Sequence, residues 1–371
     1  MSQRTPLHEV HRQLAATFTD FAGWSMPVRY TSEIAEHSAV RTTAGLFDLS
    51  HMGQIELLGP EAGVALDFAL VGRASKIGIG RARYTMICDH DGGILDDLVV
   101  YRLADQHYLI VANASNTSVV HALLKERATG YATTIRNTSS DWSLIAVQGP
   151  AAAAIVDEIS DLDVAKLGYY AIDVGTLDGI DVLLARTGYT GEDGFEVYCA
   201  PMDSEAIWMA LSASGKSRGL VPAGLACRDT LRLEAGMPLY GQELSRDVTP
   251  FEAGLGRVVV FDKADGFVGD AALARRRDDG PLQTLVGLKS LGRRSPRTGY
   301  HVLDPASGEQ IGRVTSGAPS PTLGYPIAIA YVSTAFGATG SKLVVDVRGV
   351  HEDVEVVALP FYRRNTRSLT T

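Results

Sequence analysis

Two adjacent carboxylates, Asp96 and Asp97, interrupt the otherwise apolar segment Gly92–Val100. Successive side chains of a strand point to opposite faces, so Asp96 shares a face with Ile94 and Leu98 while Asp97 lies on the other. A charged carboxylate that loses water without finding hydrogen-bond donors is strongly destabilising. The pair therefore predicts either a site that supplies donors or a bulge or turn that leaves both acids in water. Strand alternation does not choose between these interpretations, nor between the two acids.

A second candidate region is the glycine-rich polar stretch Arg186–Glu196. Glycines allow the backbone to approach a ligand closely. Tyr189 has a ring that can stack on a flat ligand or meet its edge, and Glu196 can accept two parallel N–H bonds. The alternative is a long polar hairpin loop whose acidic side chains stay solvated.

The third candidate is the segment 226–234, which carries Arg228 and Arg232 four residues apart and hence on one face of a predicted helix. Arg228 is suited to binding a carboxylate or a ring carbonyl. An equally simple interpretation is that it pairs with Glu234 or Asp229 as part of a salt-bridge scaffold, since such ion pairs are abundant.

Composition excludes several classes of protein. The chain has 371 residues, of which 46% are hydrophobic and 21% charged, so it can bury a core and is not disordered. Its net charge of -9 argues against nucleic acid or an anionic membrane as a partner. The dinucleotide fingerprint fails because Arg83 stands where Gly78 and Gly80 would require a third glycine. Phosphate-loop, zinc-hydrolase and serine-hydrolase motifs are also absent.

The cysteines and the N-terminal residues indicate a compartment. Cys88, Cys199 and Cys227 are far apart and form no C-x-x-C pair, which is typical of buried thiols in a reducing environment. Met1–Asp20 contains no apolar signal-peptide core, and no apolar run reaches the roughly 18 residues needed to span a bilayer. We therefore expect a cytoplasmic protein.

Short segments must position these candidate residues. Arg83–Cys88, Ile94–Leu103 and His107–Asn113 read as strands, the first two joined by an Asp/Gly-rich turn, and Asn116–Thr129 reads as a helix. The order of three strands and a helix favours an α+β unit over parallel crossovers.

A second unit begins at the predicted strand Ser143–Gln148. Asp178-Gly179 is a strong hairpin signal between two further strands, and two helices follow. The remaining predicted elements of this unit are strands Ala171–Leu177, Ile180–Arg186 and Phe195–Cys199 and helices Asp203–Ser214 and Pro222–Ala235.

From about Leu282 onward short strands dominate, which predicts an antiparallel barrel or sandwich. The predicted strands are Gln283–Leu288, Ile311–Ser316, Ile327–Val332 and Lys342–Val347. Gly266–Asp279 is predicted to be a connecting helix and linker.

Eight segments, in order and over nearly the whole chain, together resemble one family, the glycine cleavage T-proteins, which are tetrahydrofolate-dependent aminomethyltransferases. The segments are Phe21–Val28, Leu46–Gly53, Gly93–Leu98, Gly188–Gly194, Arg228–Gly236, Thr249–Glu252, Val314–Gly317 and Pro360–Tyr362.

The resemblance implies a fold that the pattern alone does not show: an α+β, three-domain cloverleaf around a central folate channel. The first domain is expected to be discontinuous, at 1–50 plus 143–262, with the second inserted at 51–142. The third, at 280–371, is expected to be an antiparallel β-barrel-like domain.

The implied reaction moves the one-carbon unit of an aminomethyl group on the dihydrolipoyl arm of a lipoylated H-protein to tetrahydrofolate. Its products are 5,10-methylenetetrahydrofolate, ammonia and the dihydrolipoyl arm. No metal is expected, because the carbon is already activated by its nitrogen and sulfur. The alternative within this fold is another tetrahydrofolate-dependent demethylase. A non-enzymatic folate-binding assembly factor is disfavoured, since its K-G-C-Y-x-G-Q-E signature is missing.

By position in the family motifs, Asp97 resembles the catalytic carboxylate, and Glu196 resembles the residue that reads the N–H donors of the pterin. A pterin is flat and has an amidine-like edge that one carboxylate can bridge with two short bonds. The other residues that the resemblance assigns to the folate pocket are Tyr84, Asn113, Tyr189, Arg228, Met52 and Arg297.

Overall fold

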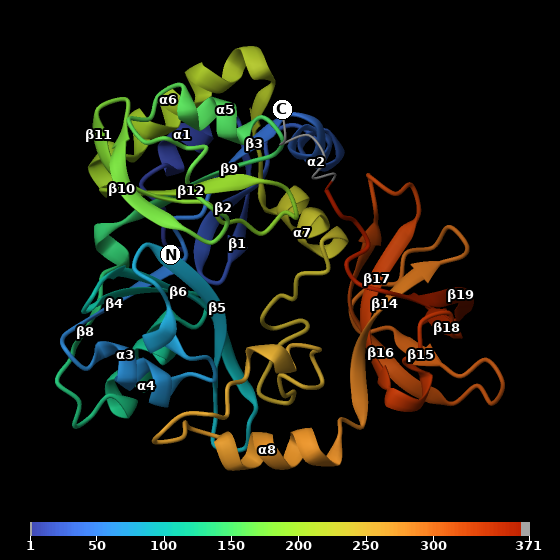
Figure 1. The fold of residues 1–371 in the computed structure, drawn as a ribbon. Coiled ribbons are helices and arrows are strands. Elements are labelled where there is room, and N and C mark those ends of the chain that lie inside the picture. The colour runs from blue at the N-terminus through green and yellow to red at the C-terminus, as the bar shows by residue number, and fades with distance from the viewer. Residues whose placement is uncertain (1, 365–371) are drawn as a thin grey trace.

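A computed structural model describes residues 2–364 of the chain. Three bodies, each built on its own sheet, surround a common centre (Figure 1). The first is a six-stranded sheet, the second a five-stranded sheet, and the third a closed barrel. The fold is therefore α+β with a C-terminal antiparallel barrel, as predicted.

The five-stranded sheet has the order β5-β6-β7-β4-β8 and carries the two adjacent acids on β6. Helices α3 and α4 cover one face, where Ile55, Leu66, Leu98 and Leu124 belong to one buried cluster. The predicted strands and helix of this region are confirmed. The bounds are β4 (Gly53–Leu58), α3 (Ala62–Ala69), β5 (Arg81–Cys88), β6 (Ile94–Ala104), β7 (His107–Ala112), α4 (Thr117–Arg127) and β8 (Thr134–Asn137).

The six-stranded sheet has the order β10-β11-β12-β9-β3-β13. Strand β3 precedes the five-stranded sheet in sequence and the other strands follow it, so the chain leaves this sheet and later returns. The predicted hairpin at Asp178-Gly179 is confirmed by the pairing of β10 with β11. The bounds are β3 (Ala44–Asp48), β9 (Ser143–Gln148), β10 (Ile172–Leu177), β11 (Ile180–Ala185), β12 (Gly194–Cys199) and β13 (Leu220–Pro222). The domain boundaries themselves stay a prediction.

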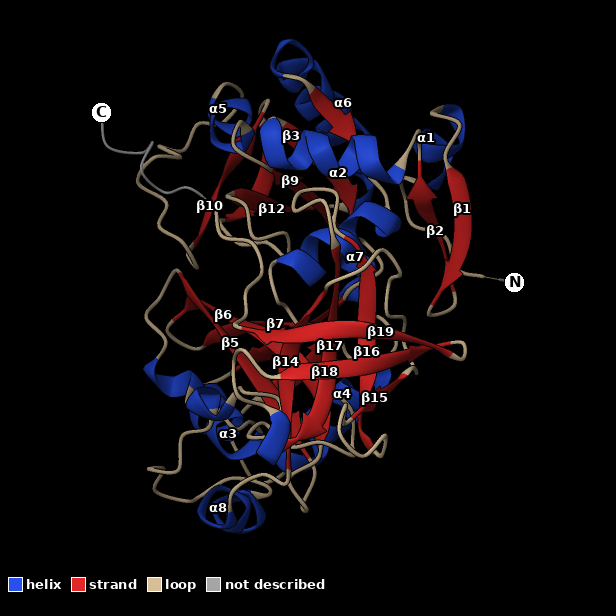
Figure 2. Cartoon of the chain, turned by 90° about the vertical axis from the view of Figure 1, so that its right-hand side faces the viewer, coloured by secondary structure: helices blue, strands red, loops and turns tan. Residues whose placement is uncertain are grey.

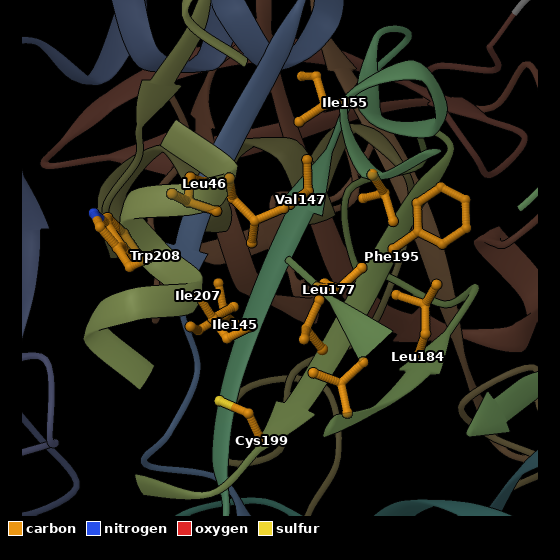
Figure 3. Close-up of a cluster of buried hydrophobic side chains, with 14 of the residues drawn as sticks. Leu46, Ile145, Val147, Ile155, Leu177, Leu184, Phe195, Cys199, Ile207 and Trp208 are labelled. Carbon is orange, nitrogen blue, oxygen red and sulfur yellow. The ribbon is translucent and has the colours of Figure 1, made fainter. Parts of the chain in front are cut away.

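Helices pack on the outer face of this sheet. Leu46, Val147 and Phe195 point from its strands into a cluster that Trp208 of α6 closes (Figure 3). Helix α7 instead lies toward the molecular centre (Figure 1). An N-terminal hairpin, β1 (Thr17–Phe21) with β2 (Trp24–Arg29), was not predicted. The helices are α1 (His8–Gln13), α2 (Glu33–Thr42), α5 (Ala152–Asp157), α6 (Ser204–Gly215) and α7 (Leu225–Glu234).

The C-terminal body closes because β14 pairs with both β17 and β19. Figure 2 shows the barrel strands facing the viewer, with α8 (Asp270–Asp279) below them. The barrel prediction is therefore confirmed over the sandwich, and β15 and β19 are additions to the predicted strands. The bounds are β14 (Gln283–Ser290), β15 (His301–Leu303), β16 (Gln310–Pro319), β17 (Pro326–Ser333), β18 (Lys342–Val347) and β19 (Val350–Val357).

Apolar clusters join the three bodies. Phe47, Tyr101 and Leu231 belong to a buried cluster shared by the two open sheets and α7. Val71 and Tyr331 belong to another, which connects the five-stranded sheet with the barrel. Such contacts hold the bodies in fixed relation, so residues distant in sequence can form one site. All three cysteines are buried free thiols. Among residues 2–364, no helix combines the length and apolar character needed to cross a bilayer.

Candidate functional site

A cavity of about 800 Å³ lies where the three bodies meet, and side chains of each body line it. Every candidate residue assigned by the resemblance lies in its wall. These are Met52, Tyr84, Asp97, Asn113, Tyr189, Glu196, Arg228 and Arg297. The fold therefore brings together residues that are up to 245 positions apart in the chain.

Asp97 enters the wall from β6 and is partly buried. Its carboxylate accepts hydrogen bonds from Tyr84 Oη at 3.1 Å and from Asn113 Nδ2 at 2.8 Å. Tyr84 reaches it because Met86 is the register partner of Asp97, so Tyr84 lies two residues along β5 on the same face. Burial raises the pKa of Asp97 above its usual range.

Asp96 points away from the cavity and is completely buried. It accepts three hydrogen bonds, from the backbone N–H of Asn113 at 3.0 Å and from Asn113 Nδ2 and Asn116 Nδ2, each at 2.8 Å. The register of β5 and β6 shifts beside this point, between Ile87 and Cys88. A bulge is thus present, but the interpretation that it leaves both acids in water is wrong. Burial and the neighbouring Asp97 raise the pKa of Asp96 to about 7.

Glu196 lies near the beginning of β12, in the six-stranded sheet, and lines the cavity. Its Oε2 accepts a hydrogen bond from Thr187 Oγ1 at 2.5 Å and a longer one from Tyr101 Oη at 3.4 Å. Both donors are buried and address the same oxygen. The carboxylate is therefore fixed in orientation by one of its oxygens while it borders the cavity.

The glycine-rich loop is folded against the protein and is not a solvated hairpin. Thr190 is fully buried and Glu192 nearly so. A Cβ added to Gly188 would lie only 2.0 Å from Gln148 Oε1, so a larger residue there would displace the Gln148 side chain that binds Thr187 and Thr190. The solvated alternative for this stretch is wrong.

Tyr189 and Arg228 form one pair at the cavity wall. The guanidinium carbon of Arg228 lies 4.9 Å from the centroid of the Tyr189 ring, and Tyr189 Oη donates to the carbonyl of Pro238 at 2.5 Å. Burial lowers the pKa of Arg228. The stacking holds a cation and an aromatic face side by side in the wall.

The scaffold alternative for Arg228 named the wrong partners. Asp229 contacts Arg232, with 2.7 Å between Nη2 and Oδ1, and Glu234 contacts Arg41 from helix α2. Arg232 itself is buried and also binds Glu243 at 2.8 Å. The salt-bridge role on this helix therefore belongs to Arg232, and Arg228 is oriented toward the cavity.

Met52 and Arg297 complete the predicted set. Met52 follows the end of β3 and borders the cavity from between the two sheets. Arg297 comes from the loop between β14 and β15 and donates from Nη1 to the carbonyl of Gly317 at 3.2 Å. It is exposed, so it marks the barrel side of the cavity near solvent.

Other residues of the wall were not predicted as site residues, notably Phe21, His51, Tyr101 and Tyr240. His51 is nearly buried, and burial lowers its pKa to about 4, so its ring is neutral at pH 7. Its ring meets that of Phe21 edge-on with centroids 5.5 Å apart. Both residues lie in segments that carry the family resemblance, Phe21–Val28 and Leu46–Gly53, but only Phe21 belongs to the unpredicted N-terminal hairpin.

Comparison with known proteins gives the family. Residues 7–263 match the model of the GCVT N-terminal domain, and residues 283–363 match that of the glycine cleavage T-protein C-terminal barrel domain. The aminomethyltransferase of Saccharopolyspora erythraea is 59% identical over 363 residues, covering 98% of this chain and 99% of its relative. That of Streptomyces avermitilis is also 59% identical, over 366 residues, covering 98% of each chain.

A solved structure agrees. The glycine cleavage system aminomethyltransferase T from Bartonella henselae superimposes with a TM-score of 0.92 at 36% identity, covering 98% of this chain and 99% of the other. Both parts of the chain, the sheet-bearing region and the barrel, thus match in order and over their full length. The chain therefore belongs to the glycine cleavage T-protein family, the aminomethyltransferases.

Proposed function

We propose that this aminomethyltransferase binds tetrahydrofolate in the central cavity and takes the one-carbon unit from an aminomethyl group on the dihydrolipoyl arm of an H-protein. The observation that carries the proposal is the pair of carboxylates, Asp97 and Glu196, which face one cavity from two different sheets. One carboxylate addresses the reacting nitrogens and the other addresses the pterin edge.

The reaction balances without an oxidant or reductant. The carbon loses its bonds to the amino nitrogen and to sulfur, and gains bonds to N5 and N10 of the folate. The two hydrogens that leave N5 and N10 end on ammonia and on the freed thiol. The protein therefore has to move protons and stabilise a cationic carbon–nitrogen intermediate.

Asp97 is suited to both tasks. A carboxylate beside an iminium stabilises its positive charge, and a raised pKa makes the same group easier to protonate than an exposed aspartate. Its hydrogen bonds come from a phenol and an amide, which are neutral. Asp97 consequently keeps its affinity for a cation or a proton, which a neighbouring arginine would reduce.

Glu196 is proposed to bind the pterin. Thr187 and Tyr101 both engage Oε2, which orients the carboxylate for an amidine-like N–H edge. The Tyr189–Arg228 pair supplies a flat surface and a positive charge next to it. Arg297, near solvent, is proposed to attract the anionic glutamate tail of the folate.

The test is formation of methylenetetrahydrofolate from aminomethyl-loaded H-protein, run in parallel with sarcosine and with methylated sulfur donors. We expect turnover with loaded H-protein as the donor and none with sarcosine or with the methylated sulfur donors. Faster turnover with a free methylated donor would assign the chain to the demethylase alternative, and turnover with none of the donors would reject the proposal.

The pterin role of Glu196 is tested by calorimetry. Glu196→Ala is expected to weaken tetrahydrofolate binding by about 10-fold or more, since it removes a charge-assisted bidentate contact. Glu355→Ala changes a partly exposed acid on the barrel that is paired with Lys342; it is the matched control and is expected to bind folate normally. Unchanged affinity in Glu196→Ala would contradict its assignment.

A further inference from the structure

The two hydrogens of the Asn113 side-chain amide are both used on carboxylates. Nδ2 lies 2.8 Å from Asp96 Oδ1 and 2.8 Å from Asp97 Oδ1. Since Nδ2 carries two hydrogens, one can point to each acid. The residue that the resemblance assigns to folate therefore has its donors directed at the acid pair.

Asp96 is what holds Asn113 in this orientation. Its Oδ2 accepts the backbone N–H of Asn113, and its Oδ1 accepts the side-chain N–H of the same residue. Asn116 Nδ2 is a second donor to Oδ1 and gives Asp96 its third hydrogen bond. Asn113 immediately follows β7, so the side chain of Asp96 takes the place of a strand partner there. Both the backbone and the amide of Asn113 are thus fixed by one carboxylate.

A rotated amide would be harmful to Asp97. If the Asn113 side chain turned by half a revolution, its carbonyl oxygen would face the Asp97 carboxylate, which can only accept when ionised. Asp96 blocks this rotamer, because that rotamer would break its own bond from Nδ2. Asp96 does not line the cavity, so it has no contact with a bound substrate.

We propose that Asp96 is a positioning residue for the transfer reaction, acting through Asn113 to keep one amide N–H on the carboxylate of Asp97. The inference rests on the proposed function, in which Asp97 is the group at the reacting atoms. It assigns the first acid of the Asp96-Asp97 pair to orientation and the second to chemistry.

The experiment is a double-mutant cycle on kcat with Asp96→Asn, Asn113→Ala and the combined variant, using loaded H-protein and tetrahydrofolate. An asparagine at 96 places an NH2 group against the donors of Asn113 and Asn116. We expect Asp96→Asn to lower kcat by about 10- to 100-fold, as losses of orienting partners do, with KM for folate changed less than about twofold. Loss of the neighbouring negative charge alone would favour the ionised form of Asp97. A lower kcat in Asp96→Asn would therefore reflect the lost orientation of Asn113.

The combined variant separates the proposal from a general weakening of the site. If Asp96 acts through Asn113, the kcat of the double variant equals that of Asn113→Ala within about twofold, since the second change removes nothing further. Additive losses would overturn the proposal, as would wild-type kcat in Asp96→Asn or an effect seen only in KM.

Two further variants guard against misinterpretation. Asn116→Ala removes one donor to Asp96 without adding a clash. It is expected to lower kcat by about 2- to 10-fold, and it replaces Asp96→Asn as the test of the proposal if that variant fails to fold. Asp67→Asn, an acid of α3 that binds Ser75 and lies outside the cavity, is expected to keep wild-type kcat. Inactive wild-type protein would instead reject the proposed function.

Discussion

Two buried carboxylate sites in this molecule differ in what surrounds them. The acid pair Asp96-Asp97 receives hydrogen bonds from amides and a phenol, all neutral. Glu234, at the end of α7, is fully buried like Asp96, but it contacts Arg41 Nη2 at 2.9 Å and His37 Nε2 at 3.1 Å. The pKa values diverge accordingly, raised for both aspartates and lowered to about 2 for Glu234.

Glu234 also ties the barrel to the rest of the protein. It accepts hydrogen bonds from Ser320 Oγ at 2.5 Å and from Thr322 Oγ1 at 2.8 Å, both in the loop between β16 and β17. The Arg41 guanidinium favours the ionised form of Glu234 and makes it a structural anchor, whereas neutral donors leave the aspartates able to exchange a proton. The same functional group is thus directed to scaffolding or to chemistry by the charge of its donors.

The largest expected effect is on catalysis at the neutral-donor site. Asp97→Asn should lower kcat by about 10² to 10⁴, because it removes the group that stabilises the cationic intermediate and carries the proton. Thermal stability should stay the same or rise, since a partly buried charge is removed. Steady-state kinetics and a melting curve of the same preparation measure both. A variant that keeps wild-type turnover would remove Asp97 from the mechanism.

At the cation-paired site the expected effect is on folding. Glu234→Ala should cost about 3 to 5 kcal/mol of unfolding free energy, because it leaves the buried Arg41 and the Ser320 and Thr322 donors without their acceptor. Molecules that remain folded should keep kcat within a few-fold. Denaturant unfolding and active-site-normalised kinetics check this. A large kcat loss with normal stability would show that Glu234 serves the chemistry, against the comparison drawn above.

The two sites should also separate along the pH scale. The pKa of Glu234 lies below the usual 4.5, so its stabilisation is complete above pH 4.5 and is lost as the pH falls toward 2. This stabilisation amounts to about 3 kcal/mol. Asp97 has a raised pKa, so activity that needs its carboxylate should fall on acidification while the pH is still above 3.8.

As the pH is lowered, kcat should therefore begin to fall at a higher pH than the melting temperature does. The pKa shift of Asp96 has the opposite sign to that of Glu234. Protonated Asp96 stabilises the folded protein, and this stabilisation is lost as the pH rises through about 7. Asp96→Asn should remove this loss of stability between pH 3.8 and about 7. Coincident losses of activity and stability in the wild type would contradict the separation of the two sites.

The smallest expected effect is at Tyr84. Tyr84→Phe removes one neutral hydrogen bond to Asp97 and should lower kcat by about 3- to 10-fold, corresponding to about 1 kcal/mol. Tyr325→Phe, on the barrel beside Lys289, serves as the matched control. A loss as large as that of Asp97→Asn would mean that Tyr84 itself transfers the proton.

Local pattern predicted most of the elements but few of the contacts. The strand carrying Asp97 and the helix carrying Arg228 were predicted because hydrophobic periodicity and turn residues are local signals. The partners of Glu234 were not, since Arg41 lies 193 residues away and belongs to another helix. The N-terminal hairpin was missed as well, because most of its residues are exposed or partly buried and give no clear alternation.

The acid pair shows what local sequence pattern can predict and what depends on tertiary contacts. Sequence alone determined that two carboxylates interrupt an apolar strand and that their side chains point to opposite faces, because side-chain alternation is a property of the extended backbone. Only the tertiary structure decided which face is the cavity and which is buried, and that Asn113 and Tyr84 supply the donors. The reason is physical: burial and hydrogen-bond partners arise when sheets pack together, and these set the charge and the chemistry of each acid.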